Sequence, residues 1–333
     1  DPSTTGRITI VSSGGSSQNS GWFISNDIIQ PTSTSDVSIN ASDVVSLLST
    51  SPLSIKAKEI TISADVNSTT ANSLTLLARE NIIFSDSKSI LTNGGDLIFW
   101  SNSDNETING GYIYIKDGVT IDTRTQSDRS LDNGSFDDQN GGAIILGGGS
   151  GELTPTGYAL NTANSLRGGI SLGTETRGGR HNSGITLISG GGDISLKGKQ
   201  TSTYYGDAAG INAYEGFTLD AGKTGNISLD GVVSSTNASY SDGINLGNYA
   251  TTAGGTASFV RTIDGDINFS GSASDATTHS RGLTLAGGGA GLFLQSFGEG
   301  GINLSGTPGG TGTQYNILLI GVNILANSGD INL

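Results

Sequence analysis

A short glycine-led phrase recurs along the chain and constrains its fold more than any other feature. The phrase reads Gly-(Asp/Asn/Gly)-Ile-(Ser/Asn)-(Leu/Phe), and two related forms, GGAIIL and GGISL, precede its first full copy. The full copies are GDISL (192–196), GNISL (225–229), GDINF (265–269), GGINL (300–304) and GDINL (329–333). Within each copy hydrophobic and polar residues alternate, which indicates a strand with one buried face.

The spacing of the phrases predicts a solenoid with three strands in each coil. The central isoleucines lie at positions 144, 170, 194, 227, 267, 302 and 331, so their separations are 26, 24, 33, 40, 35 and 29 residues. A helical repeat would hold its period nearly constant and would show a 3.6-residue hydrophobic pattern. Instead, two further strands, GLTL from Gly282 and GLFL from Gly291, lie between the copies that begin at Gly265 and Gly300. Three short strands and three tight turns need roughly 20 residues, so the longer coils carry inserted loops.

We expect the strands to stack in parallel and in register, as in an all-β, right-handed parallel β-helix, a three-sided solenoid. Isoleucine, leucine, valine and phenylalanine then form columns inside, while serine, threonine and asparagine face water. The first 140 residues follow the same design, and Val37, Ile60 and Ile83 are spaced by 23 residues each, as bare coils would be. The strands predicted there are VSINA (37–41), LSIKA (53–57), ITISA (60–64), LTLLA (74–78), NIIFS (81–85), DLIFW (96–100), YIYI (112–115) and VTID (119–122).

No shift in composition marks a linker, so the sequence predicts one continuous β-helix over residues 1–333. Short coils are expected mostly in 1–123, and longer insertions in 124–333. We expect ten to twelve coils. A new coil begins at Asp330 without a polar capping element, which favours a section of a longer chain. The expected partners are therefore neighbouring β-helix segments or further copies in a filament.

Composition narrows the range of functions. The chain has 16 basic and 30 acidic residues, a formal charge of −14, which disfavours nucleic acid and anionic lipid as partners. No hydrophobic stretch approaches the roughly 18 residues of a membrane span, so membrane insertion is not expected. The absence of cysteine excludes disulfides and thiolate metal sites.

The amino-acid sequences of the strands also resemble those of a known family. The run VSINASDVVSL, then LSIKAKEITISADVNSTTANSLTLLARENIIF, GGYIYIKDGVTIDT and the serial GDINL phrases are similar to large bacterial surface proteins of the filamentous-haemagglutinin type. The resemblance covers most of the chain from Val37 onward. It implies an exported β-helix at the bacterial cell surface that acts as an adhesin or a filament. No catalytic or ligand motif of that family is matched.

A candidate binding stripe lies in the segments between the first and second strands of the late coils. These segments (198–209, 232–242, 272–281 and 307–315) carry Tyr204, Tyr205, Tyr240, His279 and Tyr315. Tyrosine beside serine, threonine and asparagine is suited to stacking on sugar rings and to hydrogen bonding their hydroxyls, so glycans or cell surfaces are candidate partners. The alternative is that these segments only blunt the edges of the sheets.

A candidate calcium site lies in the longest insertion, Arg124 to Asn140, which holds Asp128, Asp132, Asp137 and Asp138. Clustered carboxylates are the hard ligands that Ca²⁺ prefers. The insertion has neither EF-hand spacing nor the calcium-binding nonapeptide, so a solvated acidic loop is the alternative, and no other cofactor is expected.

A polysaccharide-degrading enzyme is the competing function, because fold alone does not fix function. Hydrolysis needs a pair of carboxylates, and Asp137/Asp138 and Asp264/Asp266 are the close doublets. His181 and His279 lie in separate polar loops, so a Ser-His-Asp site has no support. We therefore expect no enzymatic activity.

Overall fold

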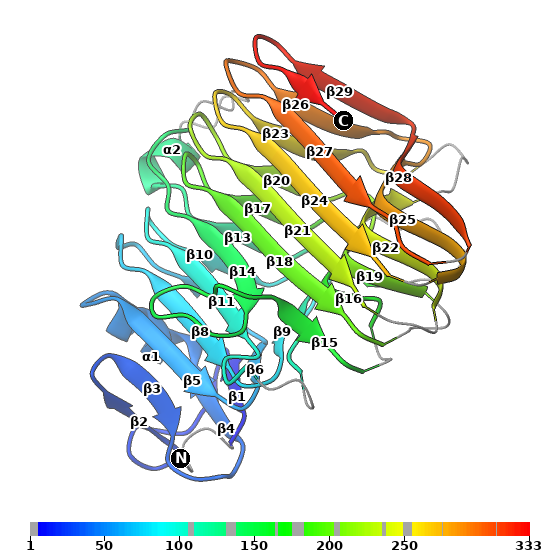
Figure 1. Cartoon of the computed structure of the whole chain (residues 1–333). Coiled ribbons are helices and arrows are strands. Elements are labelled where there is room, and N and C mark those ends of the chain that lie inside the picture. The colour runs from blue at the N-terminus through cyan, green and yellow to red at the C-terminus, as the bar shows by residue number, and fades with distance from the viewer. Residues whose placement is uncertain are drawn as a thin grey trace.

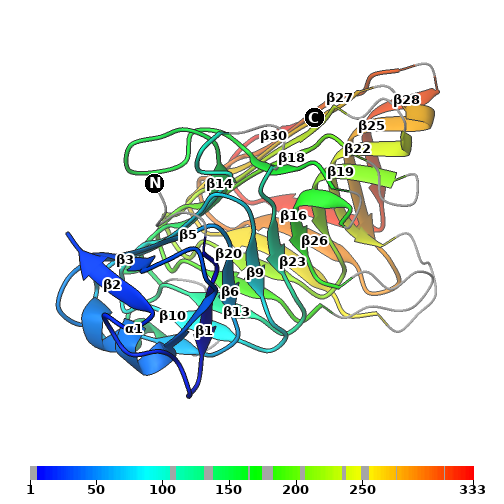
Figure 2. The ribbon, with the colours of Figure 1, turned by 90° about the horizontal axis from the view of Figure 1, so that it is seen from below.

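The chain folds as a three-sided parallel β-helix, as the repeated phrase predicts, and its coils wind in the right-handed sense (Figures 1 and 2). The structure is a computed structural model that describes residues 6–105, 110–130, 138–163, 166–174, 183–202, 207–234, 238–248, 255–274, 276–310 and 312–333. Its strands form three sheets, called A, B and C here, that run along the axis of the solenoid.

The three sheets contain nearly all of the regular structure. In spatial order, sheet A contains β28 (Thr313–Ile320), β25 (Ala276–Gly287), β22 (Ala238–Asn248), β19 (Asp207–Ala213), β16 (Gly168–Leu172), β12 (Ile113–Ile115), β9 (Ile82–Phe84), β6 (Ile60–Ile62), β1 (Ile8–Val11) and β4 (Val37–Asn40). Sheet B contains β2 (Trp22–Ser25), β3 (Ile28–Pro31), β5 (Leu53–Ala57), β8 (Leu74–Ala78), β11 (Leu97–Ser101), β14 (Ile144–Gly148), β18 (Ile194–Gln200), β21 (Ile227–Val233), β24 (Ile267–Ala273), β27 (Ile302–Thr307) and β30 (Ile331–Asn332), with β15 (Ala159–Asn161) paired to β18. Sheet C contains β29 (Val322–Ala326), β26 (Leu292–Ser296), β23 (Ser258–Thr262), β20 (Thr218–Asp220), β17 (Thr186–Ile188), β13 (Thr120–Asp122), β10 (Ser89–Leu91) and β7 (Val66–Asn67).

The isoleucines of the phrase form one column inside sheet B. Ile194, Ile227 and Ile267 are successive register partners, and the column extends to Ile144 on one side and to Ile302 and Ile331 on the other. All except Ile331 are fully buried. Ile170 was expected to mark a coil of the same series, and this is wrong. It lies in β16 of sheet A, because the coil that begins at Ile144 continues to Ile194.

Eight coils contribute one strand to each sheet, from β5-β6-β7 to β27-β28-β29, counted over the part of the chain that the structure describes. This is fewer than the ten to twelve expected, since the remaining strands belong to incomplete coils at the two ends. Strands β18, β21 and β24 show the alternation that the phrase predicts, with every second residue buried. Most of the buried hydrophobic residues form one cluster that extends from Ile8 to Leu304.

The N-terminal end of the core is covered by elements that the sequence patterns did not reveal. Helix α1 (Ala41–Leu48) buries Ala41, Val44 and Leu48 against the core, at the spacing of one helical face. Strands β2 and β3 form an antiparallel hairpin beside it. Val37 was expected one coil before Ile60, but β4 lies on the far side of β1, so the 23-residue spacing does not measure a coil. Within the described chain, no helix is long and hydrophobic enough to span a membrane.

The leading glycine of the phrase allows close stacking at the corner between sheets C and B. A Cβ atom added to Gly225, Gly265 or Gly300 would overlap the carbonyl oxygen of the glycine one coil earlier. Buried hydroxyls satisfy carbonyls of this column: Thr123 donates to Gly142 (2.5 Å) and Thr262 donates to Gly225 (2.9 Å). Glycine is therefore required here by close backbone approach rather than by a positive φ, since none of these three has one.

Two further glycine columns bring sheets A and B together beyond the core. Gly198, Gly231 and Gly271 are register partners in sheet B. An added Cβ on each would overlap the carbonyl oxygen of the facing glycine in sheet A, where the facing column is Gly210, Gly243 and Gly282. Past this point the two sheets continue as a thin two-layer extension, which we call the wing (Figure 2). Ala208, Val233 and Ala238 form a small separate hydrophobic cluster inside it.

We expect the substitution Gly231→Ala to destabilise the fold by about 1–3 kcal/mol or more, because the added methyl group meets backbone that cannot move without separating the sheets. The matched control is Gly301→Ala, whose Cβ would lie 3.1 Å from its nearest neighbour, the carbonyl oxygen of Asp330. Urea unfolding followed by far-UV circular dichroism measures both changes. Equal midpoints for the two variants would contradict the proposed role of the glycine columns.

Candidate functional site

Three of the five residues of the predicted stripe lie side by side on the wing. Tyr240, His279 and Tyr315 belong to strands β22, β25 and β28 rather than to loops, because these strands extend past the core and β22 and β25 reach 11 and 12 residues. Tyr204 and Tyr205 lie outside the described residues. We call Tyr240, His279 and Tyr315 the aromatic row.

The rings of the aromatic row stack on one another along the solenoid axis. Tyr240 and His279 are register partners, and their ring centroids lie 5.1 Å apart with an interplanar angle of 5°. This distance is close to the 4.8 Å spacing of neighbouring strands. Tyr315 is two residues out of register with His279, yet its ring remains parallel at 6.4 Å. The two tyrosines are exposed by 38% and 39%.

This stacking changes how the row can contact a ligand. Both faces of the His279 ring are turned toward tyrosines, so the imidazole presents its edge rather than a face. Stacking of a sugar ring on each aromatic ring, as the sequence suggested, is therefore not available along the middle of the row. What the row presents is a line of polar edges spaced by one coil each.

A buried ion-pair cluster supports the aromatic row from the same face of sheet A. Asp242 is fully buried and forms an ion pair with Arg281, whose Nε lies 2.7 Å from Oδ1. It accepts hydrogen bonds from Arg281 Nη2 at 3.4 Å, Arg167 Nη2 at 3.3 Å and Thr284 Oγ1 at 2.7 Å. The guanidinium of Arg281 also lies over the ring of Tyr240, 5.7 Å from its centroid. A buried carboxylate needs such partners, because desolvation penalises its charged form. The cluster thereby fixes β22 and β25 relative to each other beside the row.

A polar column that the sequence reasoning missed continues this face toward the middle of sheet A. Ser171, Asn212, Asn245 and Thr284 are successive register partners, and all are buried. Asn245 Nδ2 donates to Asn212 Oδ1 at 2.8 Å. The sequence does carry a signal for this column, because each of its residues directly follows a core residue of a sheet A strand, in the fragments IS, IN, IN and LT. Aligned polar residues directly after core residues thus indicate a polar column on the outward face of these strands.

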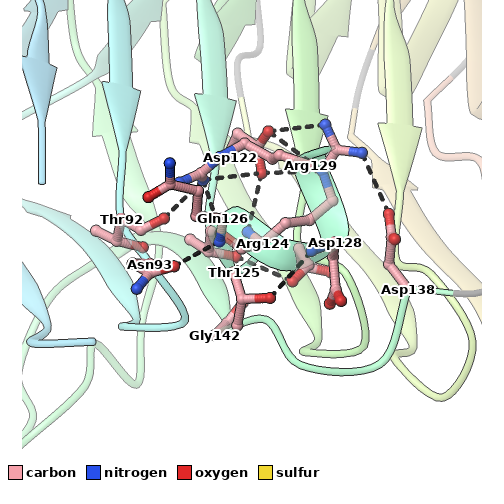
Figure 3. Close-up of polar contacts among 12 residues, drawn as sticks. Thr92, Asn93, Asp122, Arg124, Thr125, Gln126, Asp128, Arg129, Asp138 and Gly142 are labelled. Atoms are coloured by element: carbon pink, nitrogen blue, oxygen red, sulfur yellow. Dashed lines mark hydrogen bonds and ion pairs between the residues drawn. The ribbon is translucent and has the colours of Figure 1, made fainter. Parts of the chain in front are cut away.

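The acidic insertion is organised by arginine in the part that the structure describes (Figure 3). Arg124 donates to Asp122, with Nη2 2.9 Å from Oδ2, and forms a second ion pair with Asp138 at 3.2 Å. Helix α2 (Gln126–Ser130) lies over this pair, and Arg129 donates to the carbonyl oxygen of Thr92 at 2.7 Å. Arg129 thus attaches the insertion to the preceding coil, to which Thr92 belongs.

The carboxylates proposed for calcium have protein partners or lie outside the described residues. Burial raises the pKa of Asp138, although its hydrogen bond and ion pair with Arg124 act in the opposite direction. Burial alone would lower the pKa of Arg124, but the hydrogen bonds and charges of Asp122 and Asp138 raise it above its ordinary value. Asp128 Oδ2 accepts the backbone N–H of Asn140 at 3.2 Å. Asp132 and Asp137 lie outside the described chain. Within the described ranges no cluster of three metal-ligating residues occurs, and calcium binding stays a prediction.

The carboxylates weighed as a hydrolytic pair connect successive coils. Asp266 Oδ1 accepts the backbone N–H of Gly301 at 2.7 Å, and Asp264 Oδ1 accepts that of Glu299 at 3.3 Å. Asp193 Oδ1 makes the equivalent bond with the backbone N–H of Asn226 two coils earlier, at 2.8 Å. These side chains therefore satisfy N–H groups where the strands begin. His181 lies outside the described residues.

Comparisons with models of known families, with curated proteins and with solved structures found no match to this chain. The resemblance to filamentous-haemagglutinin-type proteins stays a prediction. The functional proposals below rest on geometry and chemistry.

We expect Arg281→Met to lower the free energy of unfolding by about 3–5 kcal/mol, because it removes the strongest partner of a fully buried carboxylate. The matched control is Arg79→Met in the more exposed pair with Asp104, which should cost about 1 kcal/mol or less. Urea unfolding measures both. A further substitution, Asp242→Asn, should recover part of the loss in the Arg281→Met background. Equal costs for the two arginine variants would show that Asp242 does not depend on Arg281.

Proposed function

We propose that the chain is a section of an extracellular bacterial surface protein, in which the β-helix is a stiff rod and the wing is an adhesive edge. The observation that carries this proposal is the aromatic row, where Tyr240, His279 and Tyr315 align polar ring edges on neighbouring coils. Phenol and imidazole edges combine a hydrophobic body with hydrogen-bonding groups, which suits contact with a hydroxylated surface. The proposed partners are glycans or cell surfaces, together with neighbouring β-helix segments or other copies of the chain.

The rigidity of the support favours a binding role over a passive edge. The row lies directly beside the buried cluster of Asp242, Arg167 and Arg281, and the two sheets of the wing are held together by the glycine columns. Side chains that are fixed before contact lose less conformational entropy when they bind. A segment that only blunts a sheet edge needs no such support.

Attachment of the chain to cells and to a glycan array should fall at least tenfold in the variant Tyr240→Ala/Tyr315→Ala, because both outer rings of the row are removed. The matched control is Phe259→Ala/Phe293→Ala, which removes another pair of stacked, in-register rings (5.3 Å) from sheet C. Unchanged attachment of the tyrosine variant would reject the adhesive edge. Fibre assembly that persisted in that case would favour a purely structural filament. Release of oligosaccharides from the array would instead favour the enzyme.

A further inference from the structure

A groove runs along the outer face of sheet B, whereas the aromatic row belongs to strands of sheet A. It crosses β18, β21, β24, β27 and β30 and has a volume of about 540 Å³. Its floor is the backbone around Leu196, Leu229, Phe269 and Leu304, whose side chains point into the core. The volume lies within the range of about 300–1,000 Å³ that is typical of ligand sites.

Two columns of side chains form the walls of the groove. The columns are Ser195, Ser228, Asn268, Asn303 and Asn332 on one side, and Lys197, Asp230, Ser270 and Ser305 on the other. The asparagines are linked, since Asn303 Nδ2 donates to Asn268 Oδ1 at 2.9 Å and Asn332 Nδ2 donates to Asn303 Oδ1 at 2.7 Å. Hydroxyl and amide groups therefore offer both donors and acceptors, repeated once per coil.

The segment between β14 and β15 closes the end of the groove that lies toward the N-terminus. Trp100 Nε1 donates to the carbonyl oxygen of Gly149 at 2.6 Å, which holds this segment over the sheet. At the end of the segment, Tyr158 donates its hydroxyl proton to Asp230 Oδ2 at 2.8 Å. Burial and the bond to Asp230 raise the pKa of Tyr158 to about 12, so the phenol stays a donor at neutral pH. Sheet B is hydrophobic beneath this segment, where Ile98 and Trp100 are buried, and polar beyond it.

We propose that this groove binds a linear, uncharged polysaccharide that lies along the axis of the β-helix. The five coils from Ser195 to Asn332 span roughly 19 Å at about 4.8 Å per coil. One pyranose unit of an extended chain has nearly the length of one coil, so equivalent hydroxyls of successive sugars meet equivalent wall residues. The repeated donors and acceptors of the two columns match a repeated polyol.

Charge and backbone pairing select this ligand over others. The walls contain one cation, Lys197, and one anion, Asp230, and therefore carry no net charge, while the whole chain carries −14. Acidic polysaccharides gain no attraction here and meet a repulsive field. An extended peptide binds a sheet by pairing with an exposed edge. The strands β18, β21, β24 and β27, which form most of the floor, are already paired on both sides, so that along the groove an open edge is left at β30 alone.

The test is calorimetric titration of the whole chain with cellohexaose, mannohexaose and xylohexaose, with a galacturonic acid hexamer and an extended hexapeptide as comparators. We expect at least one neutral hexasaccharide to bind, and the acidic hexamer to bind more weakly than it. Ser228→Trp, which fills the middle of the groove, should weaken that binding at least tenfold. The matched control is Ser54→Trp, which lies in the same side-chain column five coils away and should leave it unchanged.

Three results would overturn the groove: no neutral hexasaccharide binds at millimolar concentration, Ser228→Trp binds as the unaltered chain does, or the acidic hexamer or the peptide binds best. Circular dichroism of both tryptophan variants shows that they fold. Because Tyr240 lies in sheet A and does not line the groove, Tyr240→Ala should not change hexasaccharide affinity. Tyr315 is left unaltered in this comparison, since it lines a neighbouring cavity that shares Leu304, Ser305 and Leu333 with the groove. Failure of the groove is therefore distinguishable from failure of the adhesive wing.

Discussion

The structure depends on the register of the parallel strands. Each strand inside a sheet exchanges hydrogen bonds with the coils before and after it, so a residue at one position meets its equivalent in the next coil about 4.8 Å away. A property that is favourable at one position can therefore be repeated as a column. The core isoleucines, the corner glycines and the surface asparagines are three such columns. Function in this fold is built in the same way, as rows of like groups along the axis.

The glycine columns decide where the triangular core ends. At Gly231 and Gly243 the sheets approach so closely that no Cβ fits between them, and no hydrophobic side chain can continue the core beyond that point. The strands nevertheless continue, because their backbone groups still pair with the coils on either side. The wing results from this combination, and it places charged and aromatic side chains on strands rather than on loops. Strands hold such side chains more firmly than loops do.

The sequence is sufficient to predict the fold because the repeated phrase reports both the strand and the inward face. It is less informative about the elements at the two ends of the solenoid and about the sheet to which each strand belongs. Ile170 lies in a phrase that looks like the others but belongs to a different sheet. The sequence could not reveal this, because GGISL and GDISL differ in no feature that specifies the sheet. Helix α1 was missed because its eight residues carry only three core positions between strand-like runs.

The sequence also predicted only part of the candidate sites, because it does not show which residues the stacking of coils brings together. Aromatic residues are visible in any sequence, and all three residues of the aromatic row were among the five predicted for the stripe. Asp242 was not recognised, because one aspartate among polar residues gives no sign that it will be buried. The partner of a buried charge lies in another coil, and the lengths of the insertions between coils vary too widely to place it. The groove was missed because its walls are ordinary serine and asparagine, and only stacking aligns them.

The distribution of acidic residues shows how a rod of this charge avoids repulsion between its coils. The residue directly before the core strand of sheet B is, coil by coil, Asp96, Ala143, Asp193, Asn226, Asp266, Gly301 and Asp330. Three of these aspartates accept the backbone N–H one coil later, and Asn226 does the same without a charge. Aspartates never occupy adjacent coils in this column. Since like charges directly opposite destabilise a sheet, an uncharged residue in every second coil separates the carboxylates by roughly 10 Å, about one Debye length at moderate salt. The acidic surface is thereby compatible with continuous stacking.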